Sequence, residues 1–160
     1  MNNLLTRIIL TGLCALSTAA MADTKGSFDR ETVRTGPHGT TTVSVNQDAT
    51  TNGWVRDKVV TRPDGKVAER HTEVNRDPVT GVVTREVDGT KFNGKTYSKD
   101  TTRTPTASGY IKETTQVTPN GKTREKLKVV ERSPGERSVD VTRVNGQGKV
   151  FHRSTHTTRN

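Results

Sequence analysis

Thiols are almost absent from this chain. Cys14 is the only cysteine among 160 residues, and it lies in a segment that we expect to be removed. A chain without cysteine has no disulfide framework, whatever the redox state of its compartment. Any folded structure must therefore be stabilised by backbone pairing and side-chain packing.

Large apolar side chains are also scarce. Aromatic residues make up 4% of the chain and the wider hydrophobic set makes up 28%. So few bulky groups cannot fill a thick core at the density of protein interiors. Low hydrophobicity combined with high charge is also the composition of disordered chains, so disorder in isolation is one alternative for this sequence.

The one long apolar run lies near the start, within residues 1–22. Arg7 is the only charged residue there, an apolar stretch follows, and Ala20-Met21-Ala22 has the small-x-small pattern of a signal-peptidase site. The run is too short for a stop-transfer helix. These features predict a cleaved secretory signal over 1–22 and an exported protein, periplasmic or extracellular.

The remaining residues, 23–160, show no change in composition that would divide them into domains. We expect a single β-repeat domain without a transmembrane segment, whose ends, 23–35 and 155–160, are loose. A lipid anchor at Cys14 would require a small residue before it, and Leu13 stands there instead. We therefore do not expect a lipoprotein.

A three-residue phrase recurs at nearly constant spacing. The phrases Gly65-Lys66-Val67, Gly94-Lys95-Thr96, Gly121-Lys122-Thr123 and Gly148-Lys149-Val150 are separated by steps of 29, 27 and 27 residues. A second series of turns, at Gly53, Gly81, Gly109 and Gly135, alternates with the first. A fixed period of this size indicates a repeat architecture, here with two strands and two turns in each unit.

The turn residues predict hairpins. Asn-Gly pairs at 52–53, 93–94, 120–121 and 145–146 are typical of type I′ turns, in which both central residues have positive φ. Pro63-Asp64-Gly65 predicts a type I turn with glycine in the left-handed conformation. Between the turns lie segments rich in Val, Thr, Tyr and Ile, which favour strands.

We therefore predict an all-β protein with about ten antiparallel strands in a meander, built from two-strand repeats of about 27 residues, as an open or single-layer twisted sheet. An up-and-down barrel is the alternative closed form. The expected strands cover residues 28–35, 40–47, 54–62, 66–75, 82–88, 95–103, 110–118, 122–132, 137–144 and 149–157.

The repeat also predicts columns of side chains. Residues four apart on a strand share a face, which aligns two basic columns: Lys66, Lys95, Lys122 and Lys149, and Arg70, Lys99, Lys126 and Arg153. Aromatic rings for stacking on bases are supplied by Trp54, Tyr97, Tyr110 and Phe151. The other turns predict a common apolar side formed by Val55, Val59, Val83, Val87, Ile111, Thr115, Val139 and Val141.

Catalytic and metal-binding patterns are missing. Carboxylates have basic neighbours in the sequence, as in Arg85-Glu86 and Glu131-Arg132, which we interpret as exposed cross-strand charge pairs. His152 and His156, four apart on a strand, lie too far apart for one metal ion. No serine elbow, calcium loop or carboxylate dyad is present. We expect no enzyme activity, no cofactor and no metal.

Two functions are compatible with these features. The first is a non-catalytic structural or interaction role at the cell surface or in the extracellular matrix, with self-association through open strand edges. The alternative is binding of an anionic polymer (nucleic acid, acidic polysaccharide or lipopolysaccharide) through the basic columns. The formal net charge of +9 favours anionic partners.

Overall fold

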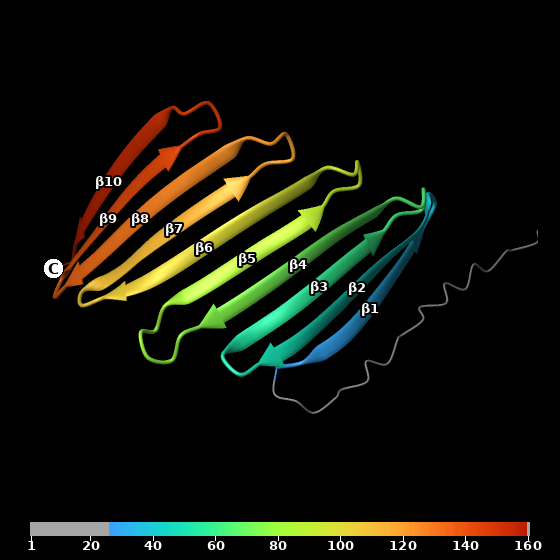
Figure 1. The fold of residues 1–160 in the computed structure, drawn as a ribbon, viewed down its shortest axis with the longest axis horizontal. Helices are drawn as coiled ribbons and strands as arrows, with labels where there is room; N and C mark the ends of the chain where they lie inside the picture. Colours follow the sequence, from blue (N-terminus) through green and yellow to red (C-terminus); the bar gives the residue numbers. More distant parts are fainter. Residues whose placement is uncertain (1–25, 160) are drawn as a thin grey trace, which may run out of the picture.

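Residues 26–159 form one continuous twisted β-sheet (Figure 1), seen in a computed structural model that describes this part of the chain. The predicted signal segment, with Cys14, lies outside the described residues. The sheet contains ten antiparallel strands in the order of the sequence. Their bounds are β1 (Phe28–Gly36), β2 (Gly39–Thr50), β3 (Gly53–Thr61), β4 (Val67–Arg76), β5 (Val83–Thr90), β6 (Thr96–Thr106), β7 (Gly109–Val117), β8 (Thr123–Ser133), β9 (Glu136–Val144) and β10 (Val150–Thr158).

The sheet is open, as Figure 1 shows. β1 and β10 form its two edges, and each pairs with only one neighbour. The predicted meander is confirmed, and the barrel alternative is wrong because the first and last strands do not meet. Among the described residues no second layer packs on the sheet, so both faces are open surfaces.

The Gly-Lys turns form hairpins of a different type from the one that the Asn-Gly pairs predict. In the turn at 62–66, the Gly65 N–H donates to the Arg62 carbonyl at 3.0 Å, and the Arg62 N–H donates to the Lys66 carbonyl at 3.0 Å. Only glycines have positive φ in the described chain, so the type I′ prediction is wrong. These turns are type I with glycine in the left-handed position, as predicted for Pro63-Asp64-Gly65.

The second series of glycines serves a different purpose at two of its positions. Gly53 and Gly109 do not have positive φ. A Cβ atom on Gly53 would lie 1.8 Å from the Val74 carbonyl oxygen, and one on Gly109 would lie 1.9 Å from that of Val130. Glycine is required there because the backbone of the next strand approaches too closely for any side chain.

Few side chains are buried. The buried apolar residues are Val45, Val87 and Val130, the last with 0% exposure, and the buried polar ones are Gln47 and Thr72. Pairing register places all five on the same face of the sheet. The limited core therefore lies on one side of a single layer.

The predicted common apolar side is wrong. The strand register places Val83, Val87, Val139 and Val141 on the face with the buried residues, but Val55, Val59, Ile111 and Thr115 on the opposite face. The turns that precede these strands differ in length, so positions counted from each glycine do not keep a constant face.

Candidate functional site

The two faces of the sheet carry charge of opposite sign. Cross-strand pairs share a face, and the register between successive strands is continuous, so every strand residue can be assigned to one side. Every Lys and Arg within the ten strands lies on the face with the buried residues. We call it the basic face; its cations are Arg30, Arg34, Arg56, Lys58, Arg70, Arg76, Arg85, Lys99, Arg103, Lys112, Arg124, Lys126, Lys128, Arg132, Arg137, Arg143 and Arg153.

Every Asp and Glu within the strands lies on the other side, which we call the acidic face. Its carboxylates are Asp29, Glu31, Asp48, Asp57, Glu69, Glu73, Glu86, Asp88, Asp100, Glu113, Glu125, Glu131, Glu136 and Asp140. The strand histidines, His71, His152 and His156, lie there too. Within the strands there is no exception to this separation.

The interpretation of neighbouring acids and bases as charge pairs is therefore wrong. Arg85 and Glu86 are adjacent in sequence, and adjacent strand residues point to opposite faces. Glu86 lies directly opposite Glu73 on β4 and Asp100 on β6, so its cross-strand neighbours are carboxylates. Similarly, Arg132 lies opposite Arg137.

Like charges are aligned on the basic face as well. Arg103, Lys112 and Lys128 form a row across β6, β7 and β8, each opposite the next. Lys126 lies opposite Arg143. Directly opposed like charges are unfavourable, and no carboxylate of a strand shares this face to offset them. A bound anion would remove this repulsion.

A hollow of about 480 Å³ lies on the basic face. Its lining includes Lys99, Arg124, Lys126, Arg143 and Phe151, together with Glu125, a residue of the acidic face. Partial burial and then the positive charges of Arg143, Lys128, Lys112 and Lys99 lower the pKa of Lys126. The part of this shift that comes from the neighbouring cations reflects a positive local potential, which attracts anionic groups.

At the β1–β3 end of the basic face, one arginine makes cation–π contacts with two rings. The Arg56 guanidinium lies 4.8 Å from the Trp54 ring centroid and 5.7 Å from that of Phe28. It also donates through Nε and Nη2 to the Gln47 side-chain oxygen, with a distance of 2.8 Å for the Nε bond. Gln47 is buried and donates in turn to the Gly26 carbonyl at 2.6 Å. This network fixes the direction of one basic-face cation.

A second aromatic cluster lies on β6–β8. Arg103 is 4.4 Å and the Lys128 Nζ 5.7 Å from the Tyr110 ring centroid. Burial raises the pKa of Tyr110, but the hydrogen bond with Lys128 and the charges of Lys128, Arg103 and Arg137 outweigh it, so the net shift is downward. The phenol oxygen therefore lies in a positive potential.

The remaining two rings differ in exposure. Tyr97 is opposite Gly89, and a Cβ on Gly89 would lie 2.7 Å from the Tyr97 hydroxyl group, so this ring lies over the glycine. Phe151 is 48% exposed, with the Lys149 Nζ 5.3 Å from its centroid. Of the four predicted stacking residues, Phe151 is the one left with a largely open ring.

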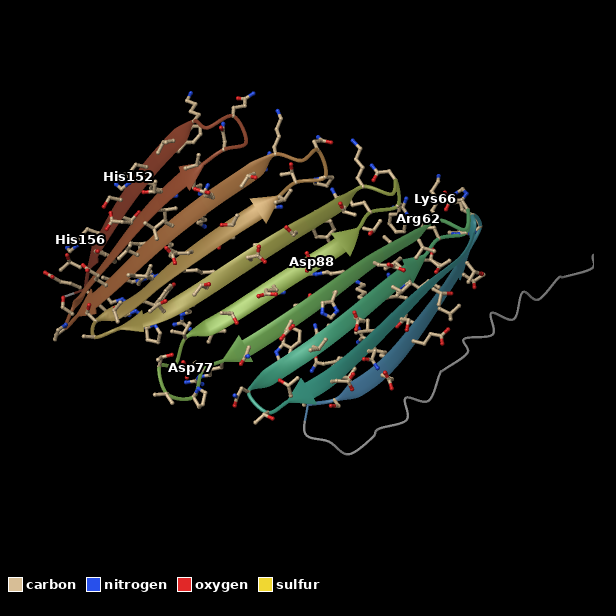
Figure 2. The ribbon with its side chains drawn as sticks, in the orientation of Figure 1. Arg62, Lys66, Asp77, Asp88, His152 and His156 are labelled. Carbon is tan, nitrogen blue, oxygen red and sulfur yellow. The ribbon has the colours of Figure 1, made fainter. Side chains whose placement is uncertain are left out.

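Further cations line one end of the sheet. The hairpins β3–β4, β5–β6, β7–β8 and β9–β10 all turn there, and Figure 2 shows Arg62 and Lys66 at this end and Asp77 at the other. We call this end the turn rim; its cations are Arg62, Lys66, Lys91, Lys95, Lys122 and Lys149. Neighbouring turns are in contact, since the Lys95 ammonium donates to the Asn120 side-chain oxygen at 2.9 Å.

The structure divides the predicted basic columns between two surfaces. Arg70, Lys99, Lys126 and Arg153 lie on the basic face, as do Trp54, Tyr97, Tyr110 and Phe151. Lys66, Lys95, Lys122 and Lys149 lie in the turns of the rim. The Gly-Lys turns precede only β4, β6, β8 and β10, so positions counted from these turns do not include the cations of the other six strands. The signal that could have found the others is strict alternation of acid and base within each strand.

Other site types are not formed by the described residues. Within residues 26–159 no group of three or more His, Asp or Glu side chains is placed to hold a metal ion. The same residues form no helix with the length and apolarity that a membrane crossing requires. In comparisons with known proteins, no family model, no curated protein and no solved structure matches the chain.

Proposed function

We propose that the protein is an exported, non-catalytic binder of an anionic polymer, which lies across the basic face. The observation that supports it is the exclusive placement of the strand cations on one face, in rows of opposed like charges. A polymer with closely spaced phosphate, sulfate or carboxylate groups offsets many of these charges at once. Counterion release then contributes much of the binding free energy.

Charge, rather than base stacking, is the expected basis of recognition. Trp54 and Tyr110 already stack with Arg56 and Arg103, and Tyr97 covers Gly89. Base stacking on these rings would require displacement of the groups that cover them. We therefore expect little preference among sequences, and one additional stacking contact at Phe151.

The hollow between β6 and β10 is the expected centre of the contact. A variant with Lys99, Arg124, Lys126 and Arg143 all changed to Gln removes four of its cations. Its matched control changes Lys66, Lys95, Lys122 and Lys149 to Gln, so the turn rim is deprived of four cations instead. Titrations use a labelled single-stranded oligonucleotide, a sulfated polysaccharide and an inorganic polyphosphate.

We expect the hollow variant to bind at least about tenfold more weakly than the rim variant, because the four cations that it lacks converge on one surface. For the single strand, the slope of log K against log salt becomes shallower by about 3 when four phosphate-binding cations are neutralised. Binding that is insensitive to salt, or equal in both variants, would contradict the proposal. The order of affinities among the three polymers identifies the anionic group preferred.

A further inference from the structure

We infer that the acidic face is a docking surface for the basic face of a second copy of this chain, so that copies stack face to face. Both surfaces are single-signed, opposite in charge and carried on the same sheet. Each face lacks within its own strands the counter-charges that the other face supplies. This interface is distinct from association through the open strand edges.

The area available is large enough for a stable complex. Ten strands at about 4.8 Å spacing and about nine residues at about 3.3 Å give each face roughly 1,400 Å². Full overlap would bury roughly 2,800 Å² in total, above the size of standard interfaces. Two sheets of similar twist pack face to face at about 10 Å.

Apolar groups on the acidic face would also be covered. Val59, Val117 and Leu127 lie on this face and are 36%, 37% and 40% exposed. Val59 lies opposite Glu69, and Leu127 lies opposite Glu113. The aliphatic stems of Lys and Arg from another copy can pack on these two residues while the charged ends reach the carboxylates. Charge complementarity and apolar burial then act at the same surface.

The stack has a direction. A basic face against another basic face is repulsive, so a symmetric dimer is excluded on charge. When one copy covers the acidic face of the next, one acidic and one basic face remain free at the two ends. A head-to-tail contact of this kind does not close and produces an open assembly.

The test uses two complementary variants of the full chain. The acidic-face variant changes Glu73, Glu86, Glu113 and Glu125 to Gln and Asp100 to Asn. The basic-face variant changes Lys58, Lys99, Lys112, Lys126 and Lys128 to Gln. Both substitution sets remove like-charge repulsion, so both variants are expected to fold, which circular dichroism checks. As a control, the rim variant of the binding experiment is extended by Lys91→Gln, so that it lacks Lys66, Lys91, Lys95, Lys122 and Lys149 and has lost the same number of charges as each face variant.

Sedimentation velocity at low salt, after nuclease treatment, should show concentration-dependent association of the wild type and the rim variant. Each face variant alone should be monomeric. Their equimolar mixture should form a one-to-one complex that does not grow, because only one intact basic face and one intact acidic face are present. At about 500 mM salt, where the Debye length is only a few ångströms, the complex should dissociate.

Several results would contradict the proposal that copies stack face to face. A wild type that is monomeric at low salt, or a mixture that does not associate, contradicts it directly. Loss of association on nuclease treatment would instead identify a polyanion bridge between basic faces.

Association through strand edges has its own control. The Asn145 N–H donates to the Lys149 carbonyl, and hydrogen-bonded pairs of residues alternate with non-hydrogen-bonded pairs along β9–β10. By this alternation Ser154 and Asp140 form a non-hydrogen-bonded pair, so the Ser154 N–H points away from β9. Ser154→Pro removes that outward donor and should leave face stacking unchanged. If it abolishes association, the edge rather than the acidic face is the contact. The acidic-face variant should still bind polyanions, so failure of either proposal can be recognised separately.

Discussion

Single residues on the two faces differ in the length and surroundings of their charged groups. On the basic face, long Lys and Arg side chains extend beyond short neighbours such as Val45, which lies between Arg30 and Lys58. Their aliphatic stems can cover these neighbours while the charges stay in water. Asp and Glu are too short to do the same, which fits the finding that the buried side chains of residues 26–159 lie on the basic face.

His71 is a histidine whose surroundings in the fold shift its pKa. Its Nδ1 lies 2.7 Å from the Asp57 carboxylate on β3. That hydrogen bond, partly opposed by desolvation, raises the pKa of His71, and the charges of Asp57, Glu73 and Asp88 add to the shift. Because the folded-state pKa is raised, the stabilisation is fully present below about pH 6.5 and is lost as pH rises through the folded pKa.

His71→Gln should therefore reduce the free energy of unfolding more at pH 5.5 than at pH 9. The difference should be a few tenths of a kcal/mol, since both groups are about half exposed. Urea unfolding at the two pH values measures it. His152→Gln, on the edge strand, serves as the control. An effect of His71→Gln that is equal at both pH values would contradict the assignment.

At the scale of elements, glycines fix the hairpins by two separate physical requirements. Gly121 ends a tight turn with φ of +71°, and a Cβ there would meet nothing within 4 Å. Gly109 has no unusual φ, but the Val130 carbonyl occupies the position of its missing side chain. The first requirement concerns the backbone of one residue, and the second concerns the contact between β7 and β8.

Gly121→Ala should destabilise the protein by about 1 kcal/mol, the cost of placing an L-residue in the left-handed region. Gly109→Ala should cost more, because the backbones of two strands must separate. Urea unfolding of the two variants gives both values. Gly121→Asn, which tolerates positive φ better, should recover part of the loss. A smaller loss for Gly109→Ala than for Gly121→Ala would show that the close approach relaxes easily.

The strands and their order could be predicted from the sequence because they depend on local signals. Turn residues such as Pro63-Asp64-Gly65 and the β-branched segments between them are enough to define a meander. Whether the sheet closes depends on contact between β1 and β10, and no local pattern encodes it. At Asn93-Gly94 and Asn120-Gly121 the turn type was mispredicted because Asn-Gly also suits a type I turn that ends on a left-handed glycine. At Asn52-Gly53 and Asn145-Gly146 the glycine of the pair has no positive φ at all.

The candidate site was predicted only in part, for a different reason. Arg85-Glu86 looks like an ion pair in a linear sequence, but one residue step on a strand reverses the face. Separation of charge over the whole sheet follows from alternation in every strand combined with the register of every hairpin. The prediction from the Gly-Lys phrases considered only the strand after each of these turns and therefore identified only part of the basic face.

For the whole molecule, the arrangement of like charges on each face lowers the free energy of unfolding of the isolated sheet. Opposed like-charge pairs occur on both faces, for example Glu73–Glu86 and Lys58–Arg70. At a few tenths of a kcal/mol each, the opposed pairs together amount to on the order of 2 kcal/mol. Salt should reduce this repulsion, because the pairs are near the surface.

The free energy of unfolding should therefore rise by about 1–2 kcal/mol between roughly 20 and 500 mM NaCl. Urea unfolding followed by circular dichroism measures the change, at protein concentrations low enough to keep the wild type monomeric. The acidic-face variant should show a smaller rise, since part of its repulsion has been removed. A stability that falls with salt would mean that attractive ion pairs dominate.

Contacts between strands in the described sheet join only sequence neighbours. Removal of one hairpin therefore affects only the two strands that flank it, and these two strands can pair with each other instead. An in-frame recombination that joins Gly94 directly to Lys122 would delete 27 residues, pair β5 with β8, and keep Lys126 on the side that Lys99 occupied. Unequal crossover between matching turns of the gene can therefore add or remove one hairpin at a time. The number of strands in the sheet, and with it the area of both faces, can change in evolution by such steps.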